Sequence, residues 1–378
     1  MSDQRLPDSA EATGLDRAVV ALPDGTVLLD DFTLLAGRGE LLAVLGPSGC
    51  GKSTLLRAIA GLQRLRSGRV LIQGRDVTRL EPPGRDVAMV FEKTALFPTL
   101  DLARNMAFGL TQRRTAAAEV EQRVDQQAER LGIRGLLRRK PTQISMGQRG
   151  QAGIGRALVR EPKVFLLDEP LANLDLGERA RMRRVIAQTV KASGAATIYV
   201  THDQTEAMAI GDRIAVINDG RLHQLGTSAD LYERPVDLFV ADFVGQASVG
   251  IVPASPPDTT TLAGYRVGDR TLMTWQPLPA GLSGAVGRAV TLALRPESVT
   301  AVPLNPDPEA TVLTGRVRSV ERTGRDTFLT VELPTGRLIG RFDGRARVRI
   351  GDLIGLSVEA AAAHVFDTAT GRALHHPG

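Results

Sequence analysis

The chain has 378 residues, enough for two or three domains and a large buried core. Its 47 basic and 42 acidic residues leave a net charge of +5, a mild excess of scattered arginines that does not indicate nucleic-acid binding. The only cysteine is Cys50, which excludes an internal disulfide. No apolar run reaches the ~18–20 residues of a membrane span, and the polar N-terminus lacks a signal peptide's apolar core. We therefore expect a chain that is cytoplasmic, or peripheral on the cytoplasmic side of a membrane.

A glycine-rich octapeptide at residues 46–53 indicates a phosphate-binding loop. It follows the apolar run 41–45 and precedes a helical stretch at 54–60, which is the context that a P-loop requires. Glycines let backbone N–H groups turn toward phosphate oxygens, and the helix start adds further free N–H groups. Lys52 would reach the β- and γ-phosphates, and Ser53 would offer its hydroxyl to Mg²⁺. The candidate nucleotide-binding residues here are Gly46, Pro47, Ser48, Gly49, Cys50, Gly51, Lys52, Ser53 and Thr54.

From about Leu15 to Val244 the chain alternates short apolar runs with longer amphipathic stretches. The apolar runs at 87–91, 164–168 and 197–200 are typical of buried strands in a largely parallel sheet, and the stretches 116–131 and 177–192 predict helices. This alternation predicts an α/β domain. The one dense basic run, Arg138-Arg139-Lys140, is interpreted as a solvated helix end rather than as a nucleic-acid patch.

Two carboxylates follow the apolar run 164–168, with Asp168 at its tip and Glu169 one residue later. Asp168 suits Mg²⁺, a hard cation that prefers oxygen ligands. Glu169 would point elsewhere and could polarise an attacking water. Together with the phosphate-binding loop, the pair predicts nucleotide hydrolysis as well as binding.

The sequence changes in character after Gly245. Prolines punctuate the next stretch, and short alternating segments then appear at 311–313, 315–320, 327–333 and 338–342, separated by turn residues. This pattern predicts an all-β module, interpreted as a small barrel. We therefore expect a flexible N-terminus at 1–14, a nucleotide-binding domain at 15–244 and a β-domain at 245–378.

Several motifs, taken together, resemble those of ATP-binding cassette (ABC) ATPases. Residues 144–149, Ile-Ser-Met-Gly-Gln-Arg, resemble the signature sequence Leu-Ser-Gly-Gly-Gln. Residues 171–175 resemble the D-loop, and the segment 201–208 resembles the switch region, with His202 as the switch histidine. The segments 294–297, 315–317 and 365–371 resemble the transport-associated β-domain of maltose-type import ATPases. The resemblance spans nearly the whole chain and implies an ABC cassette of the P-loop NTPase class, a mixed sheet with a helical subdomain, followed by an all-β, OB-like regulatory domain.

The resemblance also implies a head-to-tail homodimer that holds ATP and Mg²⁺ between its two copies. Glu169 and His202 would be catalytic, the first on the attacking water and the second on the γ-phosphate. The implied metal ligands are Ser53, Glu92 and Asp168. Across the interface, Ser145 and the Gly147 N–H of the partner copy would contact the γ-phosphate. Gln148 and Asp175 are the further implied nucleotide-binding residues.

The sequence departs from the family pattern at several positions. Glu92 stands where Gln is usual, and it either tunes hydrolysis as a charged metal ligand or turns toward solvent. Met146 replaces the first signature glycine, which strains the backbone if φ is positive there and costs little if the backbone is helical. Extra glycines follow in the next predicted helix, where each costs ~1 kcal/mol relative to alanine. The region 20–25 lacks the aromatic ring that usually stacks on adenine, so no adenine-contacting residue is named.

These features indicate the ATPase subunit of a bacterial ABC importer, with carbohydrate as the expected solute. Importers of ferric iron, polyamines, sulfate or phosphonates stay open, as does a regulatory or scaffold subunit with weakened ATPase activity. A soluble ABC ATPase acting on DNA or ribosomes would need a coiled-coil insertion or tandem cassettes, and the sequence has neither. The expected partners are two permease subunits, docking near Leu96, Phe97 and Leu100, and indirectly an extracytoplasmic solute-binding protein, but no nucleic acid. The expected location is the cytoplasmic face of the cell membrane.

Overall fold

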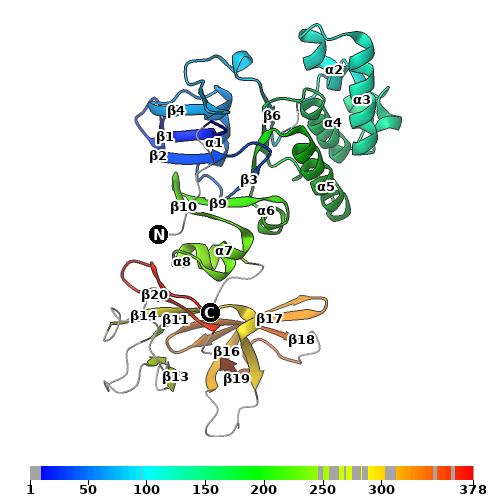
Figure 1. Ribbon diagram of the computed structural model, residues 1–378. Helices are drawn as coiled ribbons and strands as arrows, with labels where there is room; N and C mark the ends of the chain where they lie inside the picture. The colour runs from blue at the N-terminus through cyan, green and yellow to red at the C-terminus, as the bar shows by residue number, and fades with distance from the viewer. Residues whose placement is uncertain are drawn as a thin grey trace. The chain divides into compact units, whose positions relative to one another are not determined.

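The computed structural model describes residues 10–93, 95–245, 250–254, 264–267, 270–274, 282, 288–302, 312–343, 347–358 and 362–377. The chain divides into two compact units, Met1–Ser228 and Ala229–Gly378, which are described separately (Figure 1). Most of the segment 1–14, predicted to be flexible, lies outside the described residues, and the first strand begins at Thr13.

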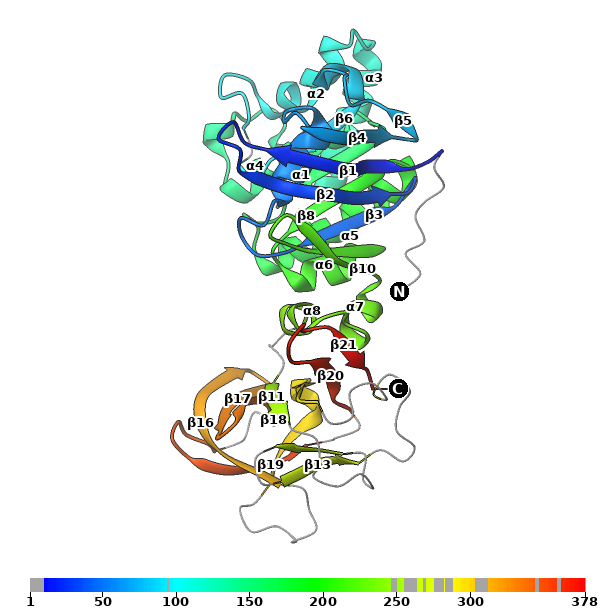
Figure 2. The same ribbon diagram turned by 90° about the vertical axis from the view of Figure 1, so that its left-hand side faces the viewer.

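The first unit contains two sheets (Figure 2). The smaller is antiparallel, in the order β2-β1-β4-β5, and consists of β1 (Thr13–Ala21), β2 (Val27–Ala36), β4 (Ser67–Ile72) and β5 (Arg75–Asp76). The larger has the order β10-β9-β3-β8-β7-β6 and is parallel except for β10. Its strands are β3 (Leu41–Leu45), β6 (Val87–Val90), β7 (Val164–Asp168), β8 (Ala196–Thr201), β9 (Arg213–Asn218) and β10 (Arg221–Gly226).

Both faces of the larger sheet are buried, which explains its continuous apolar runs. In β7, Val164 and Leu166 face the core formed with α1 (Lys52–Ala60) and the smaller sheet. Phe165 and Leu167 alternate with them and face the core formed with the other helices. The strands predicted at 87–91, 164–168 and 197–200 are therefore confirmed as β6, β7 and β8.

Helices α2, α3 and α4 pack together on one side of the larger sheet (Figure 1). The longer helices of this unit are α2 (Leu102–Gln112), α3 (Ala117–Leu131), α4 (Met146–Leu158), α5 (Leu176–Ser193) and α6 (Gln204–Ile210), and short 3₁₀ turns lie at η1 (Pro82–Arg85), η2 (Arg134–Leu136) and η3 (Pro141–Gln143). The helices predicted at 116–131 and 177–192 are confirmed. Packing also explains one glycine of α4, because a Cβ on Gly155 would lie 2.7 Å from Met106 Cε and 2.9 Å from Leu131 Cδ1.

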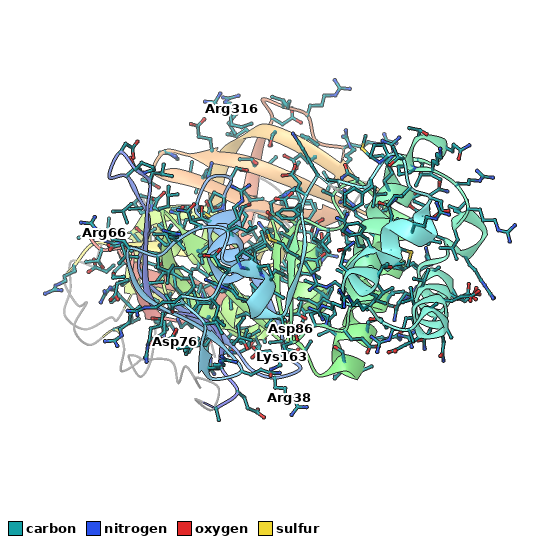
Figure 3. The ribbon with its side chains drawn as sticks, turned by 90° about the horizontal axis from the view of Figure 1, so that it is seen from above. Arg38, Arg66, Asp76, Asp86, Lys163 and Arg316 are labelled. Atoms are coloured by element: carbon teal, nitrogen blue, oxygen red, sulfur yellow. The ribbon has the colours of Figure 1, made fainter. Side chains whose placement is uncertain are left out.

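The segments that lead into β6 and β7 are fastened to each other. The Lys163 N–H donates to the Asp86 carbonyl at 3.2 Å, and the two residues lie at the same edge of the unit (Figure 3). The strands then pair in register, Val87 with Val164. The register of this pairing sets where β6 and β7 end relative to each other, and so sets the positions of the residues that follow the two strands.

The second unit is mainly a nine-stranded antiparallel sheet in the order β15-β19-β16-β17-β18-β11-β14-β20-β21. Its strands are β11 (Gly250–Ala254), β14 (Val290–Leu294), β15 (Val299–Val302), β16 (Val312–Thr323), β17 (Asp326–Leu333), β18 (Gly336–Asp343), β19 (Leu353–Val358), β20 (His364–Asp367) and β21 (Ala373–His375), while β12 (Gly264–Val267) and β13 (Arg270–Thr274) pair separately and η5 (Pro296–Ser298) is a 3₁₀ turn. The sheet curls, since a Cβ on Gly340 in β18 would lie 3.1 Å from the Val299 carbonyl in β15. The all-β prediction is confirmed, although the segments predicted at 311–313 and 315–320 belong to one strand, β16, and residue 311 lies outside the described part.

Two short helices, α7 (Ser228–Glu233) and α8 (Leu238–Phe243), belong with the β-rich unit. The buried Arg295 guanidinium donates to the carbonyls of Tyr232, Ala241 and Val244, and it lies 4.0 Å from the centre of the Tyr232 ring. A cation at the C-termini of two helices offsets their dipoles and satisfies their last carbonyls. The units therefore divide at 228/229, whereas the sequence predicted a boundary at 244/245.

Candidate nucleotide site

The larger sheet brings the predicted catalytic segments to one edge. Parallel β3, β8, β7 and β6 are neighbours, and Leu45 pairs with Thr201 while Asp168 pairs with Val200. The carboxyl ends of these strands therefore meet at one edge, where ligands of open α/β sheets bind. Asp168 is the last residue of β7, and the other candidate groups follow one of these strands: the loop 46–51, Glu169, His202 and Glu92.

The backbone of the loop 46–51 requires glycine. Gly49 and Gly51 have φ values of 84° and 106°, in the left-handed region that side chains disfavour. A Cβ on Gly46 would lie 2.3 Å from the Ile217 carbonyl. Cys50 is only 5% exposed, and burial raises the pKa of its thiol, partly offset by Lys52. Cys50 is therefore a small packing residue of this loop.

Lys52, the first residue of α1, is folded into the loop. Its ammonium donates to the carbonyls of Gly46 and Pro47, each at 2.7 Å. Lys52 is buried, with only 7% of its surface exposed. Both acceptors are neutral, so the buried positive charge keeps a strong affinity for an anion. With the free N–H groups at the start of α1, this arrangement suits phosphate oxygens.

Asp168 and Ser53 form the centre of an oxygen-rich cluster. The Ser53 hydroxyl donates to Asp168 Oδ1 at 3.2 Å. Burial raises the pKa of the Asp168 carboxyl, the Ser53 hydrogen bond opposes that rise, and the charges of Glu169 and Glu92 add to it. The described residues contain no group of three or more His, Cys, Asp or Glu side chains arranged to hold a metal alone. The donor set still fits Mg²⁺, which usually binds one or two carboxylates together with substrate phosphates and water.

Glu169 and His202 lie against each other. His202 Nδ1 is 2.9 Å from Glu169 Oε2, and the side chains are 62% and 20% exposed, respectively. Glu169 has a φ of 45°, unusual for a residue other than glycine, and its N–H donates to the Val200 carbonyl at 2.9 Å. Strained backbone of this kind clusters at functional sites. The contact between the two side chains holds a carboxylate and an imidazole together beside Asp168.

The signature segment forms the exposed N-terminus of α4. Ser145 Oγ accepts from the Gln148 N–H at 3.2 Å, while Gln148 Oε1 accepts from the Ser145 N–H at 3.0 Å, a reciprocal capping box. Met146 is the first helical residue, and its side chain is 63% exposed. Of the two alternatives for Met146, the structure supports the helical one, so the residue adds no backbone strain. Asp175 caps α5 by accepting from the Glu178 N–H at 2.9 Å.

A second candidate surface lies around the loop that leads into α2. The Phe97 and Phe108 rings are 4.5 Å apart, and both side chains are partly exposed. Buried Asn105 fixes this loop, since its amide accepts from the Phe97 N–H and donates to the carbonyls of Phe97, Leu100 and Asp101. A pocket of about 200 Å³ is lined by Ala88, Met89, Phe97, Phe108, Gly109, Arg156, Ala157 and Arg160. Of the three predicted docking residues, only Phe97 lines it, and Leu96 packs against the helical core.

The sequence interpretation missed a buried carboxyl group behind His202. Glu206 of α6 is 5% exposed, and its carboxylate accepts hydrogen bonds from the hydroxyls of Tyr199 and Thr201. Burial raises its pKa to about 7, Arg179 and Arg183 oppose the rise, and Glu169 adds to it. The signal in the sequence was Tyr199, the one aromatic ring in a buried strand that also carries Thr197 and Thr201.

Comparisons with known protein families agree with this geometry. The family described as "ABC transporter" matches residues 29–172, and the "TOBE domain" family matches residues 292–366. The chain is 44% identical over 338 residues to the "sn-glycerol-3-phosphate import ATP-binding protein UgpC" of Cereibacter sphaeroides, covering 89% of this chain and 92% of that protein. It is 40% identical over 332 residues to "UgpC 3" of Agrobacterium fabrum, covering 88% of this chain and 91% of that protein.

Solved structures of ATP-binding cassettes resemble part of this chain. The dimeric ATP-binding cassette MJ0796 in a post-hydrolysis state, bound to ADP and Pi, gives a TM-score of 0.53 at 26% identity and covers 57% of this chain and 98% of that chain. cbiO1 from Clostridium perfringens, part of the ABC transporter complex cbiONQ, gives a TM-score of 0.55 at 27% identity and covers 60% of this chain and 92% of that chain.

The raised pKa of Glu206 predicts how the stability of the protein depends on pH. Its folded pKa of about 7 exceeds the usual 4.5, so between these values the unfolded chain loses a proton that the folded chain keeps. The free energy of unfolding therefore falls as pH rises from 4.5 to 7, by on the order of 3 kcal/mol from this group. Glu206→Gln should remove that part of the pH dependence.

Thermal or urea unfolding of the wild type and Glu206→Gln at pH 5 and pH 8 measures the effect. The variant should gain stability relative to the wild type at the higher pH. The exposed Glu121→Gln provides the matched control and should leave the pH dependence as it is. Parallel stability curves for wild type and Glu206→Gln would show that Glu206 titrates normally in the folded chain.

Proposed function

The chain belongs to the ATP-binding subunits of ABC transporters, and from that premise we propose that it powers the import of a carbohydrate of the glycerol phosphate class. It is an ATPase whose hydrolysis of ATP serves an importer. The named relatives import sn-glycerol-3-phosphate, which supports this choice of solute. Importers of ferric iron, polyamines, sulfate or phosphonates remain rival assignments for the solute, which the permease and a solute-binding protein would select.

The observation that carries nucleotide hydrolysis is the alignment of Lys52, Asp168, Glu169 and His202 at one sheet edge. Lys52 supplies a buried positive charge for the β- and γ-phosphates. The Glu169 carboxylate, held by His202, is placed to orient a water and accept its proton as the water attacks the γ-phosphorus. With Nδ1 against Glu169, the second ring nitrogen of His202 is available to contact a γ-phosphate oxygen.

Ser53 and Asp168 would hold Mg²⁺, with Glu92 near enough to add a ligand or a charge. When bound, the ion neutralises charge on the phosphate oxygens and orients them. Glu92 is exposed, so the carboxylate that replaces the usual glutamine can contact the cluster without being buried. Met146 is helical and unstrained, so it no longer argues for a regulatory or scaffold subunit with weakened ATPase activity. Of the two departures from the family pattern, only Glu92 still supports that alternative.

The second half of each site would come from another copy of the chain. Ser145, Gly147 and Gln148 lie at an exposed helix N-terminus, which favours a phosphate placed against it. In a head-to-tail homodimer these groups and Asp175 would meet the ATP bound to the partner's loop 46–53. ATP would then bridge the two copies, and its hydrolysis would release them.

The proposed site for the permease is the pocket at Phe97 and Phe108, beside the loop that begins at Glu92. Phe97 lies on a loop that Asn105 fixes by hydrogen bonds, and Phe108 lies on α2. Their partly exposed rings suit an apolar anchor from a short permease helix. In the part of the chain that the structure describes, no helix combines the length and apolar character that crossing a bilayer requires. We place the subunit at the cytoplasmic face of the membrane, with two permease subunits and an extracytoplasmic solute-binding protein in the full assembly.

Glu169→Gln tests the catalytic assignment. A carboxamide keeps the shape of Glu169 but cannot accept a proton, so ATP turnover should fall by about a hundredfold or more while ATP still binds. The variant should accumulate as an ATP-bound dimer, which size-exclusion chromatography with radiolabelled ATP detects. Lys52→Ala is the contrasting variant and should bind little ATP. Near-normal turnover by Glu169→Gln would remove Glu169 from the role of base.

Phe97→Asp tests the docking surface. The substitution removes the ring that an apolar anchor would contact, and the new carboxylate would pair with Arg156 or Arg160, which also line the pocket, so assembly with the permease should fail. ATP binding by the isolated chain should stay unchanged, because the loop 46–53 lies on another element. Ile350→Asp, which charges an exposed apolar position of the other unit, is the control. Normal co-purification and transport with Phe97→Asp would place the docking site elsewhere.

A further inference from the structure

The guanidinium of Arg179 joins the D-loop to the segment that carries His202. Arg179 lies in the first turns of α5, and its N–H donates to the Asp175 carbonyl at 2.8 Å. Its side chain turns back over the D-loop, residues 171–175. Nε donates to the Leu174 carbonyl at 2.9 Å, and Nη2 donates to the Ala172 carbonyl at 3.1 Å.

The remaining nitrogen reaches the segment that carries the switch histidine. Arg179 Nη1 lies 3.6 Å from Asp203 Oδ2, and Asp203 directly follows His202. The other carboxylate oxygen, Oδ1, accepts from the Glu206 N–H at 3.0 Å and so caps α6. The Asp203 N–H in turn donates to Thr201 Oγ1 at 3.0 Å. The position of the backbone on both sides of His202 is therefore defined by Asp203.

These contacts close into a ring with the catalytic pair. The Ala172 N–H donates to the Glu169 carbonyl at 3.2 Å, which joins the D-loop to Glu169. Glu169 contacts His202, and Arg179 returns from Asp203 to the D-loop. A planar guanidinium carries donors on three nitrogens in a fixed fork, whereas the donors of an ammonium share one nitrogen on a flexible stem. Arg179 is therefore the one group in this ring that touches both loops with its side chain.

We propose that Arg179 is a positioning residue that couples the D-loop to His202. The proposal rests on the proposed function, in which the D-loop meets the second copy and His202 meets the γ-phosphate. A displacement of the D-loop by the partner then moves the Arg179 guanidinium, and Asp203 carries that movement to the imidazole. The pairing of Glu169 with His202 thereby depends on whether the second copy is seated.

Arg179→Lys and Asp203→Asn test the coupling in the full-length chain. Lysine keeps the charge but not the fork of donors, and asparagine keeps the cap on α6 but not the charge. Arg179→Lys should lower kcat by about tenfold to a hundredfold while KM for ATP changes by less than about twofold, because the loop 46–53 is untouched. The double variant should be no slower than the slower single variant, since both substitutions break one connection.

Arg184→Ala, an exposed arginine of the same helix, is the matched control and should keep wild-type kcat. Melting temperatures and the His202 imidazole resonances are recorded for every variant. A shift of those resonances in Arg179→Lys at an unchanged melting temperature supports the proposal. Wild-type kcat in Arg179→Lys, multiplicative losses in the double variant, or a kcat that falls only together with the melting temperature would overturn it. Absence of turnover in the wild type would instead contradict the proposed function, and the imidazole resonances would still decide the Arg179 proposal.

Discussion

The parallel alignment of β3, β8, β7 and β6 is the constraint on which the rest of the structure depends. Burial on both faces fixes the register of these strands, because a one-residue slip would turn every side chain toward the wrong core. With the register fixed, the residues after each strand are fixed as well. Lys52, Asp168, Glu169 and His202 converge for this reason, although more than a hundred residues separate the first of them from the others.

Charge at this edge is arranged in two opposing groups. Asp168, Glu169 and Glu92 concentrate negative charge. Burial raises the pKa of the Asp168 carboxyl, and the charges of Glu169 and Glu92 add to that rise. Lys52 is the buried positive charge, and its close acceptors are neutral carbonyls. Phosphate oxygens and a divalent cation complement this arrangement, because the anion pairs with the ammonium and the cation with the carboxylates.

Much of this site was predictable, and the reasons differ from residue to residue. The P-loop was visible because φ values such as those of Gly49 and Gly51 demand glycine at fixed positions. The backbone at Met146 could not be settled from the sequence, because a helix start and a left-handed turn allow the same letters there. The role of Arg179 could not be predicted either, because its contacts join segments that are separate in the sequence. Its helix also carries other arginines that the sequence does not distinguish from it. The two units divide before the boundary that the sequence predicted, for a similar reason. The contacts of Arg295 join α7 and α8 to the β-rich unit, and these contacts are not visible in the sequence.

The central claim is that each active site combines the loop 46–53 of one copy with the signature segment of another. Mixing two inactive chains tests it most directly, one with Lys52→Ala and the other with Ser145→Arg. Each variant alone should hydrolyse no ATP, because every site then has a defect. An equimolar mixture forms dimers with one intact site and should regain about a quarter of the wild-type rate, as random pairing of the two chains predicts. A mixture as inactive as its components, under conditions where the chains are shown to pair, would contradict the account.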